Sequence, residues 1–362
     1  MKTELTYKSI KLLKQLIATP SLSKEEDKTA TILFSFLKNE GVEAQRHLNN
    51  VWAVNKYFDP NKETLMLNSH HDTVKPNNGY TKPPFEPIIE DACLPDRRGK
   101  LFGLGSNDAG GPLVSLIAAF LHFYKEPNLA FNIVLACTAE EEISGKNGIV
   151  EIMKVVPTPS VAIIGEPTLM AMAIAEKGLM VLECTAHGKA GHAARNEGEN
   201  AIYKALKDIE WIQSYEFPVQ SKTLGPVKMT TTVINAGSQH NVIPDRCYFT
   251  IDVRTTDVYS NDQTLEIIQQ HIKSNINPKS LRLNPSSIKM EHPLIQAGIS
   301  LGMHTYGSPT LSDQSLISIP SLKLGPGDSA RSHTPDEFIY TDEIEGGIEK
   351  YIELLEKLNE MS

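Results

Sequence analysis

The chain has 362 residues, an apolar content of 40% and a formal net charge of −9. The negative charge argues against nucleic acid and anionic membranes as partners, although an anionic substrate can still bind at a locally positive site. The length exceeds what one hydrophobic core usually serves, so we expect two domains.

The chain start and the cysteines bear on cellular location. The first residues contain no apolar core of the signal-peptide kind, and the longest apolar-rich run, residues 113–123, is too short to span a bilayer. The four cysteines are far apart and form no CxxC pair, which indicates reduced thiols. We therefore predict a cytoplasmic protein with no membrane partner.

The first half of the chain predicts two helices followed by buried strands. Apolar residues recur at helical spacing over residues 6–17 and 25–37. Short apolar runs at residues 65–67, 131–137 and 161–164 predict three strands. Each run leads directly into a polar segment. In open α/β sheets ligands bind at the carboxyl ends of the strands, so these segments are placed where an active site is expected.

The region 178–285 has a different element order. Its pattern predicts a ferredoxin-like βαββαβ arrangement. The expected strands and helices lie, in chain order, at residues 179–185, 200–215, 228–234, 248–254, 263–272 and near 281–283. We therefore predict a small domain of residues 178–285 inserted into a larger α/β domain of residues 1–177 and 286–362, which ends with a helix over residues 343–358.

Five short segments carry side chains of the metal-binding kind. They are Ser69-His70-His71-Asp72, Gly105-Ser106-Asn107-Asp108-Ala109-Gly110-Gly111, Thr138-Ala139-Glu140-Glu141-Glu142, Gly165-Glu166-Pro167-Thr168 and Ser332-His333-Thr334-Pro335. Each segment alone has an ordinary alternative, such as a histidine paired with a nearby aspartate, solvated adjacent glutamates or a surface histidine. Together they supply the shared carboxylate, histidines and further carboxylates that a two-metal hydrolase site requires.

As an ordered set, these segments resemble a family of metal-dependent amidohydrolases and exopeptidases. The family includes acetylornithine deacetylase, succinyl-diaminopimelate desuccinylase, aminoacylase and the glutamate-releasing carboxypeptidase. The resemblance covers nearly the whole chain. It implies a zinc-exopeptidase-like catalytic domain, with a central mixed sheet flanked by helices, and an inserted dimerisation domain. One departure is Gly103-Leu104-Gly105, where the family usually has an arginine between the glycines.

The resemblance implies a ligand set for two divalent metal ions. His70 and Glu166 correspond to ligands of the first metal, Glu142 and His333 to ligands of the second, and Asp108 to the carboxylate that bridges both. Histidine and carboxylate ligands without cysteine suit Zn²⁺, with Co²⁺ or Mn²⁺ as alternatives.

The same resemblance implies catalytic roles beside the ligands. Asp72 corresponds to the carboxylate that accepts a hydrogen bond from the second ring nitrogen of His70, and Glu141 to the general base. A non-proline cis peptide bond is expected at Asp108–Ala109. His71 is expected to point to the opposite face of its strand, away from the metals.

Further matches concern the substrate. His192 resembles the histidine that one subunit of a homodimer donates to the substrate bound by the other. Asn241 and Arg254 resemble residues that hold the substrate's carboxylate. The alternatives are a turn residue at His192, a loop cap at Asn241 and a surface ion pair at Arg254. The loop with Gly325 and Gly327 is expected to line the pocket.

Glu166 also bears on the reaction, because in the family glutamate at this place accompanies deacylases and aspartate accompanies aminopeptidases and dipeptidases. The resemblance therefore implies hydrolysis of an N-acyl amino acid, above all N-acetylornithine to ornithine and acetate in arginine biosynthesis. The alternatives are N-succinylornithine, N-acetylcitrulline, N-acetyllysine, succinyl-diaminopimelate or a dipeptide as substrate. A binding protein that has lost catalysis is disfavoured, because every ligand position and the base are present.

Overall fold

The computed structural model describes residues 2–91, 98–195 and 197–361. Two compact units form. Unit 1 comprises Met1–Ile174, Ile288–Tyr306 and Ser312–Ser362, and unit 2 comprises Ala175–Ser287 and Gly307–Leu311. The boundaries lie within a few residues of those expected from the sequence, but residues 307–311 join unit 2. The backbone N–H of Lys177 donates to the carbonyl of Ser308 at 3.2 Å, which holds this short segment to unit 2.

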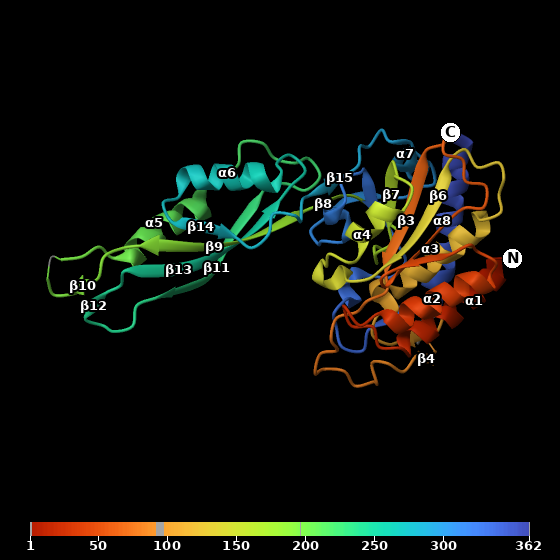
Figure 1. Ribbon diagram of the computed structural model, residues 1–362, viewed down its shortest axis with the longest axis horizontal. Coiled ribbons are helices and arrows are strands. Elements are labelled where there is room, and N and C mark those ends of the chain that lie inside the picture. The colour runs from red at the N-terminus through yellow and green to blue at the C-terminus, as the bar shows by residue number, and fades with distance from the viewer. Residues whose placement is uncertain (1, 92–97, 196, 362) are drawn as a thin grey trace. The chain divides into compact units, whose positions relative to one another are not determined.

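Unit 1 is built on a mixed sheet with the strand order β1-β2-β6-β3-β7-β17-β8. Its central neighbours β6, β3, β7 and β17 are parallel, whereas β1, β2 and β8 pair antiparallel. Figure 1 shows β3, β6 and β7 side by side. The strands, in chain order, are β1 (Gln45–His47), β2 (Asn50–Val54), β3 (Thr64–His70), β6 (Asn132–Thr138), β7 (Val161–Ile164), β8 (Met172–Glu176) and β17 (Ser321–Lys323).

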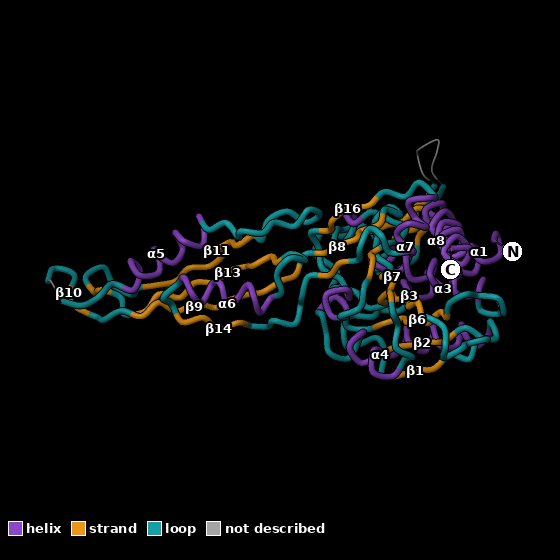
Figure 2. The backbone as a smooth tube through the Cα atoms, turned by 90° about the horizontal axis from the view of Figure 1, so that it is seen from above, coloured by secondary structure: helices purple, strands orange, loops and turns teal. Residues whose placement is uncertain are grey.

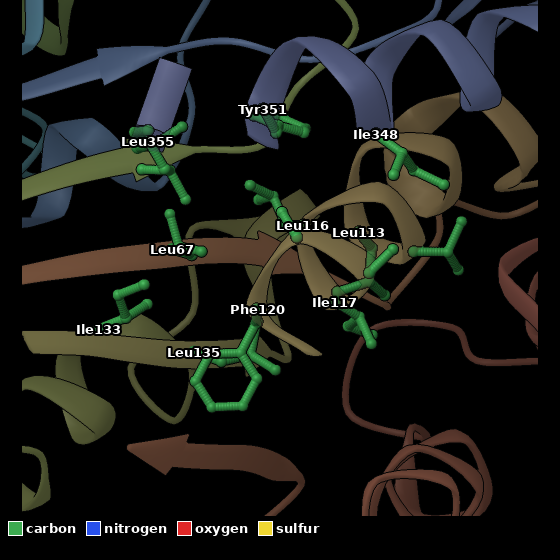
Figure 3. Close-up of a cluster of buried hydrophobic side chains, with 14 of the residues drawn as sticks. Leu67, Leu113, Leu116, Ile117, Phe120, Ile133, Leu135, Ile348, Tyr351 and Leu355 are labelled. Carbon is green, nitrogen blue, oxygen red and sulfur yellow. The ribbon is translucent and has the colours of Figure 1, made fainter. Parts of the chain in front are cut away.

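Helices cover both faces of this sheet. On one face, Leu67 and Leu135 pack in a core with α3 and α8, and Figure 3 shows Phe120 of α3 and Tyr351 of α8 in that cluster. On the other face, Val134 packs against α4. Because β3, β6 and β7 are buried along their whole length, they form continuous apolar runs in the sequence. The helices of unit 1 are α1 (Lys2–Ile17), α2 (Asp27–Asn39), α3 (Gly111–Phe123), α4 (Ile149–Val155), α7 (Pro293–Ser300) and α8 (Thr341–Met361).

A separate three-stranded sheet in unit 1 holds the segment that follows His333. β18 (Phe338–Tyr340) pairs antiparallel with β5 (Lys100–Phe102), and β5 pairs with β4 (Ile88–Glu90). The Lys100 ammonium lies 4.5 Å from the centre of the Phe338 ring, and the guanidinium carbon of Arg331 lies 4.7 Å from it. These pairings fix the chain on the C-terminal side of His333.

Unit 2 has the predicted ferredoxin-like arrangement. Its antiparallel sheet has the order β11-β13-β9-β14, which Figure 2 shows, and α5 and α6 share a core with one face. β9 alternates between buried and more exposed residues because only that face is covered. The elements are β9 (Gly178–His187), β10 (Gly191–His192), α5 (Ala201–Ser214), β11 (Lys228–Ala236), β12 (Val242–Ile243), β13 (Arg246–Thr255), α6 (Asn261–His271), β14 (Asn275–Pro278) and β15 (Ser286–Ser287).

The prediction for the last strand of this arrangement was wrong. The strand expected near residues 281–283 lies instead at β14, which pairs with residues 182–185 of β9. The carbonyls of Leu281 and Leu283 instead accept hydrogen bonds from the Asn261 side chain at 3.1 and 2.8 Å. The carbonyl of Leu283 also accepts the backbone N–H of Leu179 at 3.0 Å, so an amide at the start of α6 and the start of β9 together hold this segment. The short β10–β12 ribbon was also not expected.

The ends of the insertion lie beside each other. β15 pairs antiparallel with the end of β8, with Ala175 opposite Ser287 and Glu176 opposite Ser286. The chain therefore leaves for unit 2 and returns from it on neighbouring strands. β16 (Thr305–Ser308) also runs across the boundary between the units.

Two further sequence predictions concern cysteines and membrane spans. Cys137, Cys184 and Cys247 are buried and free, and Cys93 lies outside the described residues. Among the helices of the described ranges, none combines the length and the apolar content that crossing a bilayer requires.

Candidate metal centre

The ends of three parallel strands place the candidate ligands together. His70 ends β3 and is paired in register with Thr138, the last residue of β6, and Asn68 of β3 is paired with Ile164, the last residue of β7. The turn after β6 carries Glu141 and Glu142, and the turn after β7 carries Glu166. Because parallel strands end at the same edge of a sheet, these three segments converge.

The structure brings all five predicted metal ligands into two groups that share one carboxylate. His70, Asp108 and Glu166 form the first group, and Asp108, Glu142 and His333 form the second. Within each group the potential ligand atoms lie within 4.8 Å of one another. The two Asp108 oxygens face different groups. Oδ1 lies 3.3 Å from Nε2 of His70, and Oδ2 lies 3.6 Å from Nε2 of His333. A carboxylate placed in this way is able to contribute one oxygen to each group.

The ring of His70 is oriented by Asp72. Its Nδ1 lies 3.1 Å from the backbone carbonyl oxygen of Asp72 and 3.5 Å from the Oδ1 atom of the same residue. The nearer acceptor is thus the carbonyl and not the carboxylate that the sequence suggested. With its proton on Nδ1, His70 presents the Nε2 lone pair to the ligand group.

The Asp72 carboxylate instead holds the turn that carries the two glutamates. Its Oδ1 accepts the backbone N–H of Glu141 at 3.0 Å, and its Oδ2 accepts that of Glu142 at 3.2 Å. The hydroxyl of Ser23 donates to the same Oδ2 at 2.7 Å. Asp72 is fully buried, and these bonds satisfy a charge that would otherwise be costly to bury. One carboxylate therefore links the first ligand segment to the third.

A second buried carboxylate, from the residue that precedes α2, supports this turn. Glu26 accepts the backbone N–H of Glu140 at 3.2 Å and the side-chain amide of Asn49 at 2.9 Å. The carboxylate of Glu140 accepts the Asn147 amide at 2.8 Å. Glu140 therefore braces the loop beyond the turn, while its two neighbours in sequence reach the site.

His71 lies apart from the ligand groups, as predicted from strand alternation. Its Nε2 lies 2.9 Å from the carbonyl oxygen of Asn49, and its Nδ1 lies 2.9 Å from the hydroxyl of Thr29. Burial lowers the pKa of His71 to about 4, so the ring is neutral near pH 7. We assign it to the packing between β3 and α2.

The loop that carries Asp108 has the predicted cis peptide bond at Asp108–Ala109. The Asn107 side chain spans to the loop after β17, because its amide donates to the Asp328 carbonyl at 3.0 Å and its Oδ1 accepts the Asp328 N–H at 3.0 Å. The hydrogen bond with His70 is the main cause of the lowered pKa of Asp108, and a hydrogen bond from the Ser332 hydroxyl adds to it. The contacts of Asn107 and Ser332 were not evident from the sequence.

Gly325 and Gly327 are buried beside the ligand loops. A Cβ atom at Gly325 would lie 2.5 Å from the carbonyl oxygen of Glu166, and one at Gly327 would lie 2.5 Å from Oδ1 of Asn107. Gly327 also has a φ of +90°. Both glycines therefore permit a close approach to loops that present ligands. Their contact with substrate stays a prediction.

The ligand groups concentrate negative charge that the nearby cationic groups do not balance. Burial raises the pKa of Glu166 to about 8 and raises the pKa of Glu142 and, strongly, that of Glu141. The hydrogen bond with Glu142 raises the pKa of His333 to about 9. Added positive charge would relieve both effects. The donors are nitrogen and oxygen without sulfur, so the site fits two divalent cations such as Zn²⁺, Co²⁺ or Mn²⁺.

The predicted substrate residues of the insertion lie in unit 2. His192 is exposed, and its Nδ1 accepts the backbone N–H of Ala194 at 3.1 Å. Asn241 is also exposed, and its carbonyl accepts the N–H of Ala193 at 3.0 Å. Arg254 makes two hydrogen bonds to Asp252 on the same strand, at 2.8 and 3.1 Å. The substrate roles of these residues stay predictions.

Comparison with known proteins gives a match within the insertion. Residues 174–279 match the family model described as the peptidase dimerisation domain of the M20 family. This match covers most of unit 2 and agrees with its ferredoxin-like arrangement.

Solved structures share the fold of nearly the whole chain. The chain is similar to aminopeptidase PepT from Bacillus cereus, with 17% identity, a TM-score of 0.73 and 98% of each chain covered. It is similar to a tripeptidase from Staphylococcus aureus, with 18% identity, a TM-score of 0.73 and 98% of this chain and 99% of that chain covered. A dinuclear metal-binding peptidase of the M20 family from Bacillus subtilis has 15% identity, a TM-score of 0.70 and 98% of each chain covered. The fold is therefore that of M20 metallopeptidases.

Proposed function

We propose that the protein is a metal-dependent hydrolase that cleaves the amide bond of a small N-acyl amino acid. The observation that carries this proposal is the pair of ligand groups joined by Asp108. A glutamate in neither group, Glu141, places its Oε2 atom 3.9 Å from Nε2 of His70. A carboxylate free of the metals but beside them is suited to proton transfer.

The chemistry follows from this arrangement. Two divalent ions held by these ligands would lower the pKa of bound water and polarise the substrate carbonyl. Glu141 would accept the proton as water attacks the amide carbon and would then donate it to the leaving amine. In the metal-free protein burial raises the pKa of Glu141 well above its usual value, and two bound divalent cations would lower it, so that the carboxylate can accept the proton. The products are a carboxylic acid and an amine.

Two features bear on the substrate, and they favour different ones. Glu166 accompanies deacylases in the resembling family, which supports N-acetylornithine first, with N-succinylornithine, N-acetylcitrulline, N-acetyllysine and succinyl-diaminopimelate as alternatives. The similar solved structures include an aminopeptidase and a tripeptidase, which supports a short peptide as the second candidate. Both candidates use the same two ligand groups and the same base.

We infer that the active form is a homodimer joined through unit 2. The matched family model is a dimerisation domain, and β11 lies at the edge of its sheet with Val233 and Ile234 each 49% exposed. An unpaired edge strand with exposed apolar side chains is suited to pairing with a second copy. In such a dimer His192 would act on the substrate bound by the other subunit.

Amine release by the zinc-loaded protein tests the reaction. The panel contains the five N-acyl substrates named above and two plain dipeptides. A strong preference for one N-acyl amino acid supports the deacylase. Cleavage of the dipeptides alone overturns it in favour of a peptidase, and no cleavage of any substrate by protein with two bound metals counts against catalysis altogether.

Subunit mixing tests the homodimer. Subunits with His192→Ala and subunits with Glu141→Gln are each expected to be inactive alone. Mixed dimers should regain activity, because one of their two sites combines an intact base with an intact His192. Verified mixed dimers without activity would contradict the role of His192 across the dimer.

A further inference from the structure

Glu337 is a buried carboxylate that belongs to neither ligand group. It lies four residues after His333 and is 1% exposed. Its Oε1 accepts the backbone N–H groups of Asn107 and Asp108 at 2.8 and 2.9 Å, and its Oε2 accepts that of Gly105 at 3.2 Å. All three donors lie in the loop that presents the bridging carboxylate of Asp108.

The Asp108 loop and the Glu337 carboxylate satisfy each other's hydrogen bonds. The loop departs from regular structure, with Gly105 at a φ of +75° and non-helical backbone angles at Asp108, so its N–H groups do not all have partners in a helix or strand. Buried backbone donors without acceptors are destabilising. A buried carboxylate is likewise costly unless it accepts hydrogen bonds. Glu337 satisfies three donors of the loop, and the loop satisfies Glu337.

The backbone of Glu337 adds a second connection. Its carbonyl accepts the N–H of Gly103 at 3.0 Å, and the next residue, Phe338, begins the strand paired with β5. Glu337 therefore bonds through both side chain and backbone to the chain that leads to Asp108. The segment that holds Glu337 also holds His333. Through this residue, the segment of a second-group ligand is joined to the loop of the shared ligand.

We propose that Glu337 is a positioning residue that aligns the Asp108 loop with the His333 segment, so that the two metal sites form together. Its loss should weaken the second site most, because that group contains both Asp108 and His333. Substitution of a residue that orients metal ligands typically lowers metal affinity by about 10–100-fold. The inference rests on the two-metal part of the proposed function and is independent of the substrate.

Titration of metal-free, full-length protein with Zn²⁺ in a calorimeter tests the role directly. Glu337→Ala removes all three hydrogen bonds and should weaken the binding of at least one of the two zinc ions by about 10–100-fold. Glu337→Gln keeps one carbonyl oxygen, which can still accept from Asn107 and Asp108, so it should restore much of the lost affinity. Unchanged affinities at both sites in Glu337→Ala would overturn the proposal.

Asp208 offers a matched control in unit 2. It is 5% exposed and accepts the N–H groups of Lys273 and Ser274 at 3.1 and 2.9 Å and the Ser274 hydroxyl at 2.6 Å. Asp208→Ala thus also removes three hydrogen bonds from a buried carboxylate. It should leave both zinc affinities unchanged. A loss equal to that of Glu337→Ala would show that general destabilisation is the cause, which overturns the positioning role.

Hydrogen exchange of the metal-free proteins provides a readout that needs neither metal nor substrate. Glu337→Ala should lose protection selectively in peptides that cover residues 103–110, and Asp208→Ala should not. Uniform loss over all of unit 1 would contradict a local role. If Glu337→Ala does not fold, Glu337→Gln alone tests the proposal. Glu337→Gln is expected to lose protection at Gly105 and to bind one of the two zinc ions several-fold more weakly than the parental protein. Parental behaviour in both measurements would overturn the proposal.

Discussion

The two units bury charge in opposite ways. Unit 1 gathers buried or nearly buried carboxylates where β3, β6 and β7 end, and several of them have raised pKa values. Unit 2 packs a core of apolar residues between one sheet face and two helices, and its buried Asp208 is satisfied by three hydrogen-bond donors. The unbalanced buried charge of unit 1 suits the binding of cations, whereas the buried carboxylate of unit 2 already has its hydrogen-bond donors.

The largest expected effect tests the charged half of this comparison. Glu141→Gln keeps the shape of the base but removes its ability to accept a proton, so turnover should fall about 10²–10⁴-fold. The content of bound metal should stay at the parental level, because Glu141 belongs to neither ligand group. Turnover on the best substrate and elemental analysis of the purified protein measure both.

Glu140→Gln is the neighbouring control. Glu140 bonds to Asn147 instead of facing the ligand groups, so its turnover should fall far less. If turnover fell equally in the two variants, or if Glu141→Gln kept near-parental turnover, the assignment of Glu141 as the base would be wrong.

Matched substitutions in the two apolar cores test whether the units are stabilised separately. Phe249 in unit 2 is 2% exposed and Phe120 in unit 1 is fully buried. Replacing either with alanine should destabilise its own unit by about 3–5 kcal/mol, because a cavity remains. Hydrogen exchange resolved by peptide measures each unit separately. If Phe249→Ala lowered protection in unit 1 as strongly as in unit 2, the units would not be separate cores.

The raised pKa values predict how acidity affects metal binding. In metal-free protein, Glu166 with a pKa of about 8 and His333 with a pKa of about 9 are largely protonated at pH 7. A metal must displace these protons, so zinc affinity should rise by about tenfold per pH unit for each proton displaced and level off above the two pKa values. Calorimetric titrations between pH 6 and 9 in buffers of different ionisation enthalpy would count the protons. Affinity that is independent of pH would contradict unbalanced charge in unit 1.

The smallest effect concerns the support of the base. Ser23→Ala removes the hydroxyl that donates to Asp72 at 2.7 Å, and hydrogen bonds to charged groups typically contribute about 1.5–3 kcal/mol. The free energy of unfolding should fall by this amount. Turnover should fall less than it does in Glu141→Gln. Ser9→Ala, which removes a buried hydroxyl bonded to a neutral carbonyl, is the control. Equal effects of the two serines would argue against Asp72 as the link to the glutamate turn.

The fold was predictable where one physical signal dominates. The strands β3, β6 and β7 are buried on both faces, so each forms a continuous apolar run that predicts a strand from the sequence alone. β14 was misplaced because the carbonyls of residues 281–283 bond to the side chain of Asn261 and, at Leu283, also to the backbone N–H of Leu179, contacts that do not show in the pattern of apolar residues. Contacts between residues far apart in the sequence therefore determine where the last strand of unit 2 lies.

The site divides in the same way. The candidate metal ligands were found from the sequence because their residue types and order carry the chemistry, and the structure brings them together. Ser23, Ser332 and Glu337 act through contacts with distant loops. Glu337 stands in Thr334-Pro335-Asp336-Glu337, where acidic residues after a proline suggest a solvated turn. Its burial shows only when the Asp108 loop is in place around it.

The pairing of β15 with the end of β8 brings the two ends of residues 177–285, the main part of unit 2, side by side. Because Glu176 lies opposite Ser286 on antiparallel strands, a two-residue hairpin turn such as Asn-Gly could join them and close the chain of unit 1 without the insertion. The same two positions would accept a foreign domain whose ends lie equally close. Evolution and protein engineering therefore have a splice point at which residues 177–285 can be exchanged while the candidate metal ligands keep their order in the sequence.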